Sequence, residues 1–262
     1  MYGQKDNREM TRYDAPKEKY GITFYPVTMQ NYMAYSRCKR ALLMRQSTLP
    51  ASYISMTYLE ALFAVDADSG FALGLTDSLV KVLALATRLN ESAFRVMVKT
   101  DEPSRISSIQ CLDSSLVFRI TPVQFSIIRE VIARQNGDEI PDESENPELV
   151  EAERDLAQAN APNMDYDPDT LLDSVAYNCG RRRDELLDWT IREFEAVRRA
   201  INRDKRYTLC GTAEYSGMVK WKRGNPCPSW CYDLIDDGSA VLEPMSAFAA
   251  RTGINAAAVP TQ

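Results

Sequence analysis

Two Ser-x-x-Lys pairs are the closest that this sequence comes to a nucleophilic site. They are Ser36/Lys39 and Ser78/Lys81, and a serine activated by a neighbouring lysine can carry out acyl transfer. Neither pair is accompanied by the further motifs of penicillin-binding enzymes, and both fall in stretches with helical periodicity. We therefore interpret both as ordinary helix-surface pairs.

The chain of 262 residues contains no histidine. This excludes Ser-His-Asp and Cys-His catalysis and every metal site that depends on imidazole. Among the six cysteines, Cys227 and Cys231 form one close pair, to which Cys179 and Cys210 could add two more thiolates. Structural zinc sites usually combine two close pairs. We therefore expect reduced thiols that pack as small apolar residues.

Other cofactor motifs are incomplete. Asp165, Asp167 and Asp169 follow the start of a calcium loop, but Thr170 stands where the loop needs glycine. The sequence contains neither a Gly-x-x-x-x-Gly-Lys phosphate loop nor a Gly-x-Gly-x-x-Gly turn. We predict a protein without cofactor or metal that is not an enzyme.

Basic residues gather in the C-terminal part of the chain. Arg181, Arg182 and Arg183 are consecutive, and Arg198 and Arg199 follow on an amphipathic stretch. A helix, a short helix and a capped helix in this order would suit a helix-turn-helix that binds DNA. The stronger interpretation is a helical arrangement whose arginines are solvated or pair with acidic residues, because the capped helix places Ile191 and Phe194 in its first, buried turn.

An aromatic segment follows the basic one. Met218, Trp221, Trp230 and Tyr232 lie close together in the sequence, beside several lysines and arginines. Trp, Tyr, Met and Arg are enriched at protein interfaces. With the five arginines above, these four residues are the candidate partner-binding residues, although core packing would explain some of the aromatic residues equally well.

Residues 1–137 must supply the first part of the fold. Residues 1–20 are polar and expected to be flexible, and 21–137 are expected to form an α+β domain. Its expected elements are a strand from Gly21, helices at 32–45, 53–65 and 76–89, a three-stranded meander within 94–120, and a helix at 121–135 that begins with the capping pair Thr121-Pro122.

The rest of the chain starts with an acidic segment. Residues 138–169 contain twelve acidic residues and one basic residue, Arg154, so the net charge of −6 hides a weakly basic remainder. We predict that 138–166 form a linker or solvated helix, 167–235 a C-terminal helical domain, and 236–262 a flexible tail. Asp167-Pro168 and Gly180 mark the two ends of its first helix, and Thr190 begins a capping box. The predicted fold class is mainly α with a small β component.

Several segments resemble phage and prophage tail assembly chaperones. In the C-terminal region these are 187–194 (LDWTIREF), 213–219 (AEYSGMV), the Lys-Trp-Lys at 220–222 and the Pro-Ser-Trp at 228–230. In the middle they are the helix of 125–136 and the Asn-Pro-Glu-Leu at 146–149. The resemblance extends from about residue 21 to 233. Trp189 stands where the family's Met-Thr-x-x-Glu-Phe motif has methionine.

The resemblance implies a non-enzymatic, mainly helical protein that binds the tape measure protein during tail morphogenesis and supports polymerisation of the tail tube protein. Such chaperones act in the host bacterial cytoplasm and are usually absent from the mature virion. Helices with aromatic and Met residues could shield an apolar stripe on a long partner. A virion component of the neck, baseplate or tail is the first alternative, and a nucleic-acid-binding phage protein that uses 181–206 is the second. A homo-oligomer is possible, and the sequence has neither an apolar run of membrane-spanning length nor a secretion signal.

Overall fold

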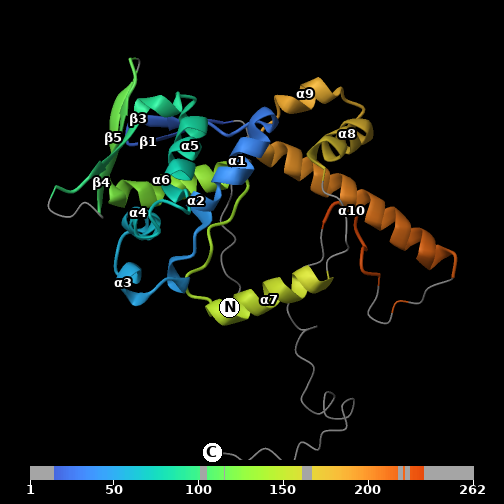
Figure 1. Cartoon of the computed structure of the whole chain (residues 1–262). Helices are drawn as coiled ribbons and strands as arrows, with labels where there is room; N and C mark the ends of the chain where they lie inside the picture. Colours follow the sequence, from blue (N-terminus) through green and yellow to red (C-terminus); the bar gives the residue numbers. More distant parts are fainter. Residues whose placement is uncertain are drawn as a thin grey trace, which may run out of the picture. The chain divides into compact units, whose positions relative to one another are not determined.

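The computed structural model describes residues 15–100, 105–114, 116–160, 167–217, 221 and 225–232. The fold is mainly helical with two small antiparallel sheets, which confirms the predicted fold class (Figure 1). The elements in chain order are β1 (Lys17–Lys19), β2 (Ile22–Phe24), α1 (Tyr32–Cys38), α2 (Arg40–Leu43), α3 (Ala51–Ile54), α4 (Tyr58–Asp68), α5 (Leu75–Thr87), β3 (Phe94–Val98), β4 (Ile106–Leu112), β5 (Val117–Ile120), α6 (Pro122–Gln135), α7 (Pro147–Asn160), α8 (Pro168–Cys179), α9 (Arg183–Leu187) and α10 (Ile191–Tyr215).

The N-terminal helices follow the predicted apolar periodicity but are divided into shorter helices. The helix expected at 53–65 is split into α3 and α4, because the Thr57 hydroxyl and backbone N–H both contact the Glu60 carboxylate in a capping box. The helix expected at 32–45 is split into α1 and α2. Part of the expected flexible N-terminus is also ordered, since β1 pairs with β2 across a turn in which Tyr20 and Gly21 both have positive φ.

The predicted meander is confirmed as a sheet of order β3-β4-β5. Ile109 of β4 pairs with Val96 of β3 and with Ile120 of β5, and both isoleucines are fully buried. Figure 1 shows α4, α5 and α6 gathered beside this sheet. The capping box of Thr121 starts α6 directly after β5, so the core-facing Phe125 follows the last strand within two turns.

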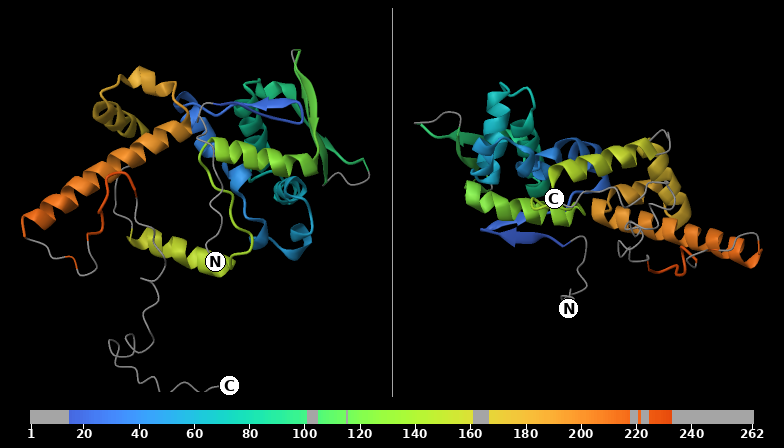
Figure 2. Two further views of the ribbon diagram at one scale, coloured as in Figure 1. Left: turned by 180° about the vertical axis from the view of Figure 1, so that it is seen from behind. Right: turned by 90° about the horizontal axis from the view of Figure 1, so that it is seen from below.

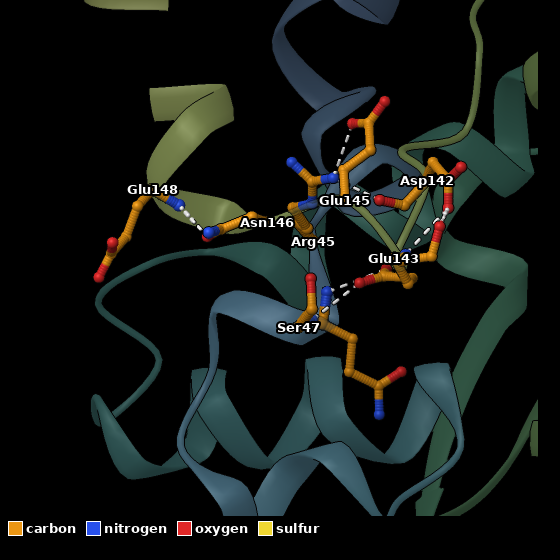
Figure 3. A network of polar contacts seen from close by, with 9 residues as sticks. Arg45, Ser47, Asp142, Glu143, Glu145, Asn146 and Glu148 are labelled. Atoms are coloured by element: carbon orange, nitrogen blue, oxygen red, sulfur yellow. Dashed lines mark hydrogen bonds and ion pairs between the residues drawn. The ribbon is translucent and has the colours of Figure 1, made fainter. Parts of the chain in front are cut away.

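The acidic segment is anchored to the N-terminal helices at its start (Figure 3). Glu143 accepts hydrogen bonds from the backbone N–H groups of Gln46 (3.1 Å) and Ser47 (2.8 Å). Arg45 forms an ion pair with Glu145 (3.0 Å) and also donates to the carbonyl of Asp142. Of the two interpretations offered for the acidic segment, a solvated helix applies to 147–160: α7 is helical and its described side chains are mostly exposed.

Contacts divide the chain into two compact units, residues 1–198 and residues 199–262. This division lies within α10 and differs from the boundary predicted in 138–166. The reason is a backbone connection: the Met29 N–H donates to the Trp189 carbonyl (2.8 Å), and the Ile191 N–H donates to the Val27 carbonyl (2.9 Å). Residues 167–198 therefore belong to the first unit together with the N-terminal elements.

A buried asparagine completes this connection. Asn136, at the C-terminal end of α6, accepts a hydrogen bond from the Val27 N–H (2.8 Å) and donates one to the Ile132 carbonyl (2.8 Å). Beside it, Asp138 accepts hydrogen bonds from the Tyr35 hydroxyl (2.8 Å) and from Lys39 (2.6 Å). Burial, and then the Asp138 charge, raise the pKa of the Tyr35 phenol, so it remains a donor.

α8 and α9 pack against each other and precede α10 (Figure 2). The predicted boundaries are confirmed here, because Asp167 caps Pro168–Cys179 and Gly180 takes the left-handed conformation that ends the helix. Ile191 and Phe194 are buried at the start of α10, as the pattern predicts. None of the helices in the described ranges is both long and apolar enough to cross a membrane.

Asn136→Ala is expected to destabilise the first unit by about 1–3 kcal/mol, because it leaves the buried Val27 N–H without an acceptor. Urea unfolding followed by circular dichroism measures this change. Asn178→Ala, on the exposed side of α8, is the matched control and should cost much less. Equal effects of the two substitutions would show that Asn136 does not hold this connection.

Glu143→Gln is expected to reduce the dependence of stability on acid pH. Partial burial by itself raises the pKa of Glu143, but the hydrogen bonds from Ser47 and Gln46 outweigh it and hold the pKa below its ordinary value. A carboxylate with a lowered pKa stabilises the fold above the unfolded-state pKa, and that contribution is lost as the pH falls through the folded-state pKa. Between about pH 5 and pH 3, the free energy of unfolding should therefore fall less steeply in the variant than in the natural chain. Glu139→Gln is the control. An unchanged slope in Glu143→Gln would contradict this role.

Candidate partner-binding surface

The Ser-Lys pairs do not show a nucleophilic arrangement. Ser78 is buried in the first turn of α5, where its hydroxyl donates to the Gly74 carbonyl (2.7 Å) and accepts from Arg40 (3.3 Å). Lys39 of the other pair forms the ion pair with Asp138. Ser36 and Lys81 are exposed, in agreement with the prediction of helix-surface pairs, whereas Ser78 differs from it because it is buried.

Arg181 and Arg182 lie between α8 and α9, Arg183 begins α9, and each of the three forms an ion pair. Arg183 reaches back to α8, where it contacts Asp173 (3.1 Å) and Asp169. Arg181 pairs with Glu185 (3.5 Å), and Arg182 pairs with Asp184 (2.8 Å). These pairs are exposed, so they contribute little to stability, but they partly neutralise the basic cluster.

The two arginines of α10 lie on either side of the division between the units. Arg198 ends the first unit and makes a two-nitrogen contact with Glu195 (2.9 and 2.6 Å). Arg199 begins the second unit and is exposed. The first turn of α10 is buried through Ile191 and Phe194, and a DNA-recognition helix would expose this turn. The local geometry thus corresponds to the helical arrangement with paired arginines.

The apolar stripe of α10 continues beyond its buried part. Leu209 lies 18 residues after Ile191, and Tyr215 lies 18 residues after Val197. At about 3.6 residues per turn, 18 residues complete about five turns, so each pair shares one face of the helix. Ile191 is only 4% exposed, whereas Leu209 is 71% exposed and Tyr215 is 93% exposed. The stripe is covered at its start and uncovered toward its end.

The aromatic loop 225–232 is held against the second half of α10. Arg203 donates to the Cys231 carbonyl (3.0 Å), and Asn225 donates to the Glu214 carboxylate (2.7 Å). The Ser229 hydroxyl accepts from the backbone N–H groups of Cys231 and Tyr232 (3.1 and 3.2 Å). Through these contacts the loop presents Trp230 and Tyr232, which are 62% and 78% exposed.

The other predicted aromatic-segment residues differ from these two. Trp221 is half-buried, and its indole nitrogen has no hydrogen-bond partner within the structure as described. Met218 lies outside the described residues. Trp230 and Tyr232 are thus the predicted aromatic residues that the structure places on the surface.

The cysteines of this region include one close contact. Partial desolvation and a hydrogen-bond contact with Cys227 raise the pKa of the Cys210 thiol, which favours the neutral form. Cys227 is buried, and Cys210 and Cys231 are half-buried. Over the described ranges, no three acidic or cysteine side chains are grouped so that they could hold a metal ion.

We define the C-terminal apolar surface as Leu209, Tyr215, Trp230 and Tyr232, all of the second unit. The sequence interpretation did not include Leu209 and Tyr215. A signal for them was present, because both continue the stripe of Ile191 and Val197 at a spacing of whole helical turns. Apolar periodicity does not indicate how far along a helix the apolar face is buried by other parts of the protein.

Comparisons with known proteins add no relative for this chain. No family model, curated protein or solved structure matches it. The likeness to tail assembly chaperones therefore depends on the short segments quoted above.

Proposed function

We propose that the protein is a non-enzymatic phage tail assembly chaperone that binds the tape measure protein through the C-terminal apolar surface. The observation that carries this proposal is the apolar stripe of α10, which is buried at Ile191 and uncovered at Leu209 and Tyr215. Contiguous exposed apolar patches mark interaction sites on monomeric proteins, and we infer that Leu209, Tyr215, Trp230 and Tyr232 form such a patch. The quoted resemblance supplies the identity of the partner.

The chemistry of the surface suits a helical partner. An amphipathic helix binds by placing its apolar residues, spaced at three and four positions, against a complementary apolar face. Leu209 and Tyr215 are six residues apart, so they lie about 120° apart around α10 and mark the two edges of such a face. Trp230 and Tyr232 are residue types that often contribute most of the binding energy at interfaces. Binding would keep the apolar stripe of a long helical protein from aggregating before the tail tube protein surrounds it.

This function would operate in the host bacterial cytoplasm before the tail is complete, and the chaperone would leave before the virion matures. The ion pairs of Arg181, Arg182 and Arg183 give no particular support to the nucleic-acid alternative. Mass spectrometry of purified virions distinguishes the chaperone from a structural component, because only the latter remains in the particle.

Co-expression with the tape measure protein from the same phage tests the proposal. The natural chain should raise the soluble fraction of the tape measure protein after centrifugation and should co-purify with it. The double variant Leu209→Gln/Tyr215→Gln should lose most of both effects, because it removes the uncovered end of the stripe. Its own free energy of unfolding should change by less than about 1 kcal/mol, since each exposed site contributes within about 0.5 kcal/mol.

The matched control is Leu156→Gln/Tyr177→Gln, which changes two similarly exposed residues on α7 and α8. This control should retain binding. The proposal is contradicted if the natural chain neither raises the soluble fraction of the tape measure protein nor co-purifies with it. The assignment of the surface is contradicted if both double variants bind the tape measure protein equally well.

A further inference from the structure

A small cavity lies where the end of α4, the start of α5 and strand β3 come together in the first unit. Its volume is about 320 Å³, near the lower limit of cavities that bind small ligands. Asp66, Thr76 and Asp77 supply its polar lining, and Phe63, Phe71 and Val96 supply apolar walls. None of these residues belongs to the C-terminal apolar surface.

Asp66 is fully buried, and one half of its carboxylate has an evident structural role. Its Oδ2 accepts a hydrogen bond from the backbone N–H of Thr76 (2.7 Å), which caps the first turn of α5. Its Oδ1 has no hydrogen-bond partner in the described part of the chain, and neither does the hydroxyl of Thr76. A buried carboxylate oxygen left without a donor costs stability, so capping alone does not account for an aspartate here.

The neighbouring cationic side chains are occupied by other groups. Arg40 donates to the Gly74 carbonyl (3.4 Å) and to the Ser78 hydroxyl (3.3 Å). Lys99, next to the cavity's strand, pairs with Glu60 (3.1 Å). A hydrogen-bond donor to Asp66 Oδ1 would therefore have to be a group other than Arg40 or Lys99.

The apolar walls indicate what kind of donor fits. Phe63 and Phe71 form an edge-to-face pair with ring centroids 5.8 Å apart, and aromatic faces attract organic cations. Phe71 is held with φ at +63°, an uncommon conformation for an aromatic residue, and it is 52% exposed. With only two carboxylates, Asp66 and Asp77, the lining lacks the six to eight oxygen ligands that calcium requires.

We propose that this cavity binds a primary alkylammonium group. The ammonium donates to Asp66 Oδ1 and is attracted by the Asp77 charge, and its alkyl chain lies against Phe63, Phe71 and Val96. A free aliphatic amine and the lysine side chain of a partner protein both carry this group. The proposal is independent of the proposed chaperone function, because it concerns a different surface.

Titration of the full chain with n-butylammonium chloride, followed by two-dimensional ¹⁵N NMR, tests the proposal. The Thr76 amide, which contacts Asp66, should shift and saturate. n-Butanol has the same shape without the charge, and sodium chloride supplies the same ionic strength, so neither should produce the shift. Even a weak complex has a dissociation constant in the millimolar range, so the shift should saturate below about 100 mM amine. The proposal would be overturned if the shift does not saturate by that concentration, or if butanol produces an equal shift.

Two variants assign the binding to this cavity. Asp66→Asn retains a good helix cap and should weaken binding at least about tenfold, a change of about 1.4 kcal/mol. Phe71→Gly removes the aromatic wall at a position with positive φ, where glycine is favoured, so it should fold well and also bind more weakly. Asp68→Asn, on the same helix but not in the cavity lining, is the matched control. Unchanged affinity in both Asp66→Asn and Phe71→Gly would overturn the assignment.

A second probe separates the two sources of the ammonium group. Nα-acetyl-lysine-N-methylamide presents the same group on a blocked peptide backbone. If it binds at least as tightly as butylammonium, the cavity accepts a partner's lysine. If only butylammonium binds, the site is specific for a free amine.

Discussion

The fold of the first unit depends on the backbone of one short segment, Val27–Met29. This backbone forms hydrogen bonds with two parts of the chain that are distant in sequence. The Val27 N–H donates to the Asn136 side chain, and its carbonyl accepts from the Ile191 N–H. One residue thus connects the end of α6 with the start of α10. Because the groups are buried, loss of either partner would leave a polar atom without water or protein to satisfy it.

The course of α10 then determines what the surface can do. Ile191 is buried at its start, and Leu209, five turns later on the same side of the helix, is exposed. We infer that one amphipathic pattern serves as core at one end and as a binding face at the other. The loop 225–232 is fastened to this second half by Arg203 and Asn225. These contacts hold the backbone that carries Trp230 and Tyr232, so less conformational entropy would be lost when a partner binds.

Much of the first unit could be predicted from local signals. Thr121-Pro122 and Asp167-Pro168 marked helix starts correctly, Gly180 marked a helix end, and alternation marked the meander. The division of the chain could not be predicted, because the contacts that join Val27 to Ile191 are between backbone atoms and have no side-chain signature. The anchoring of Glu143 was missed for a related reason: an acidic composition indicates solvation, but a single carboxylate can also cap a turn elsewhere in the chain. For the site, residue type alone predicted Trp230 and Tyr232. Predicting Leu209 and Tyr215 would have required knowing how far along α10 its apolar face is buried.

The central claim is that the uncovered end of α10 is the binding face. Hydrogen–deuterium exchange of the full chain, measured alone and with the tape measure protein, tests it most directly. The account predicts slower exchange in peptides covering 205–215 and 225–232 in the complex, with exchange in 147–160 unchanged. Slower exchange confined to 147–160 or to 181–183, with 205–215 unaffected, would contradict the account.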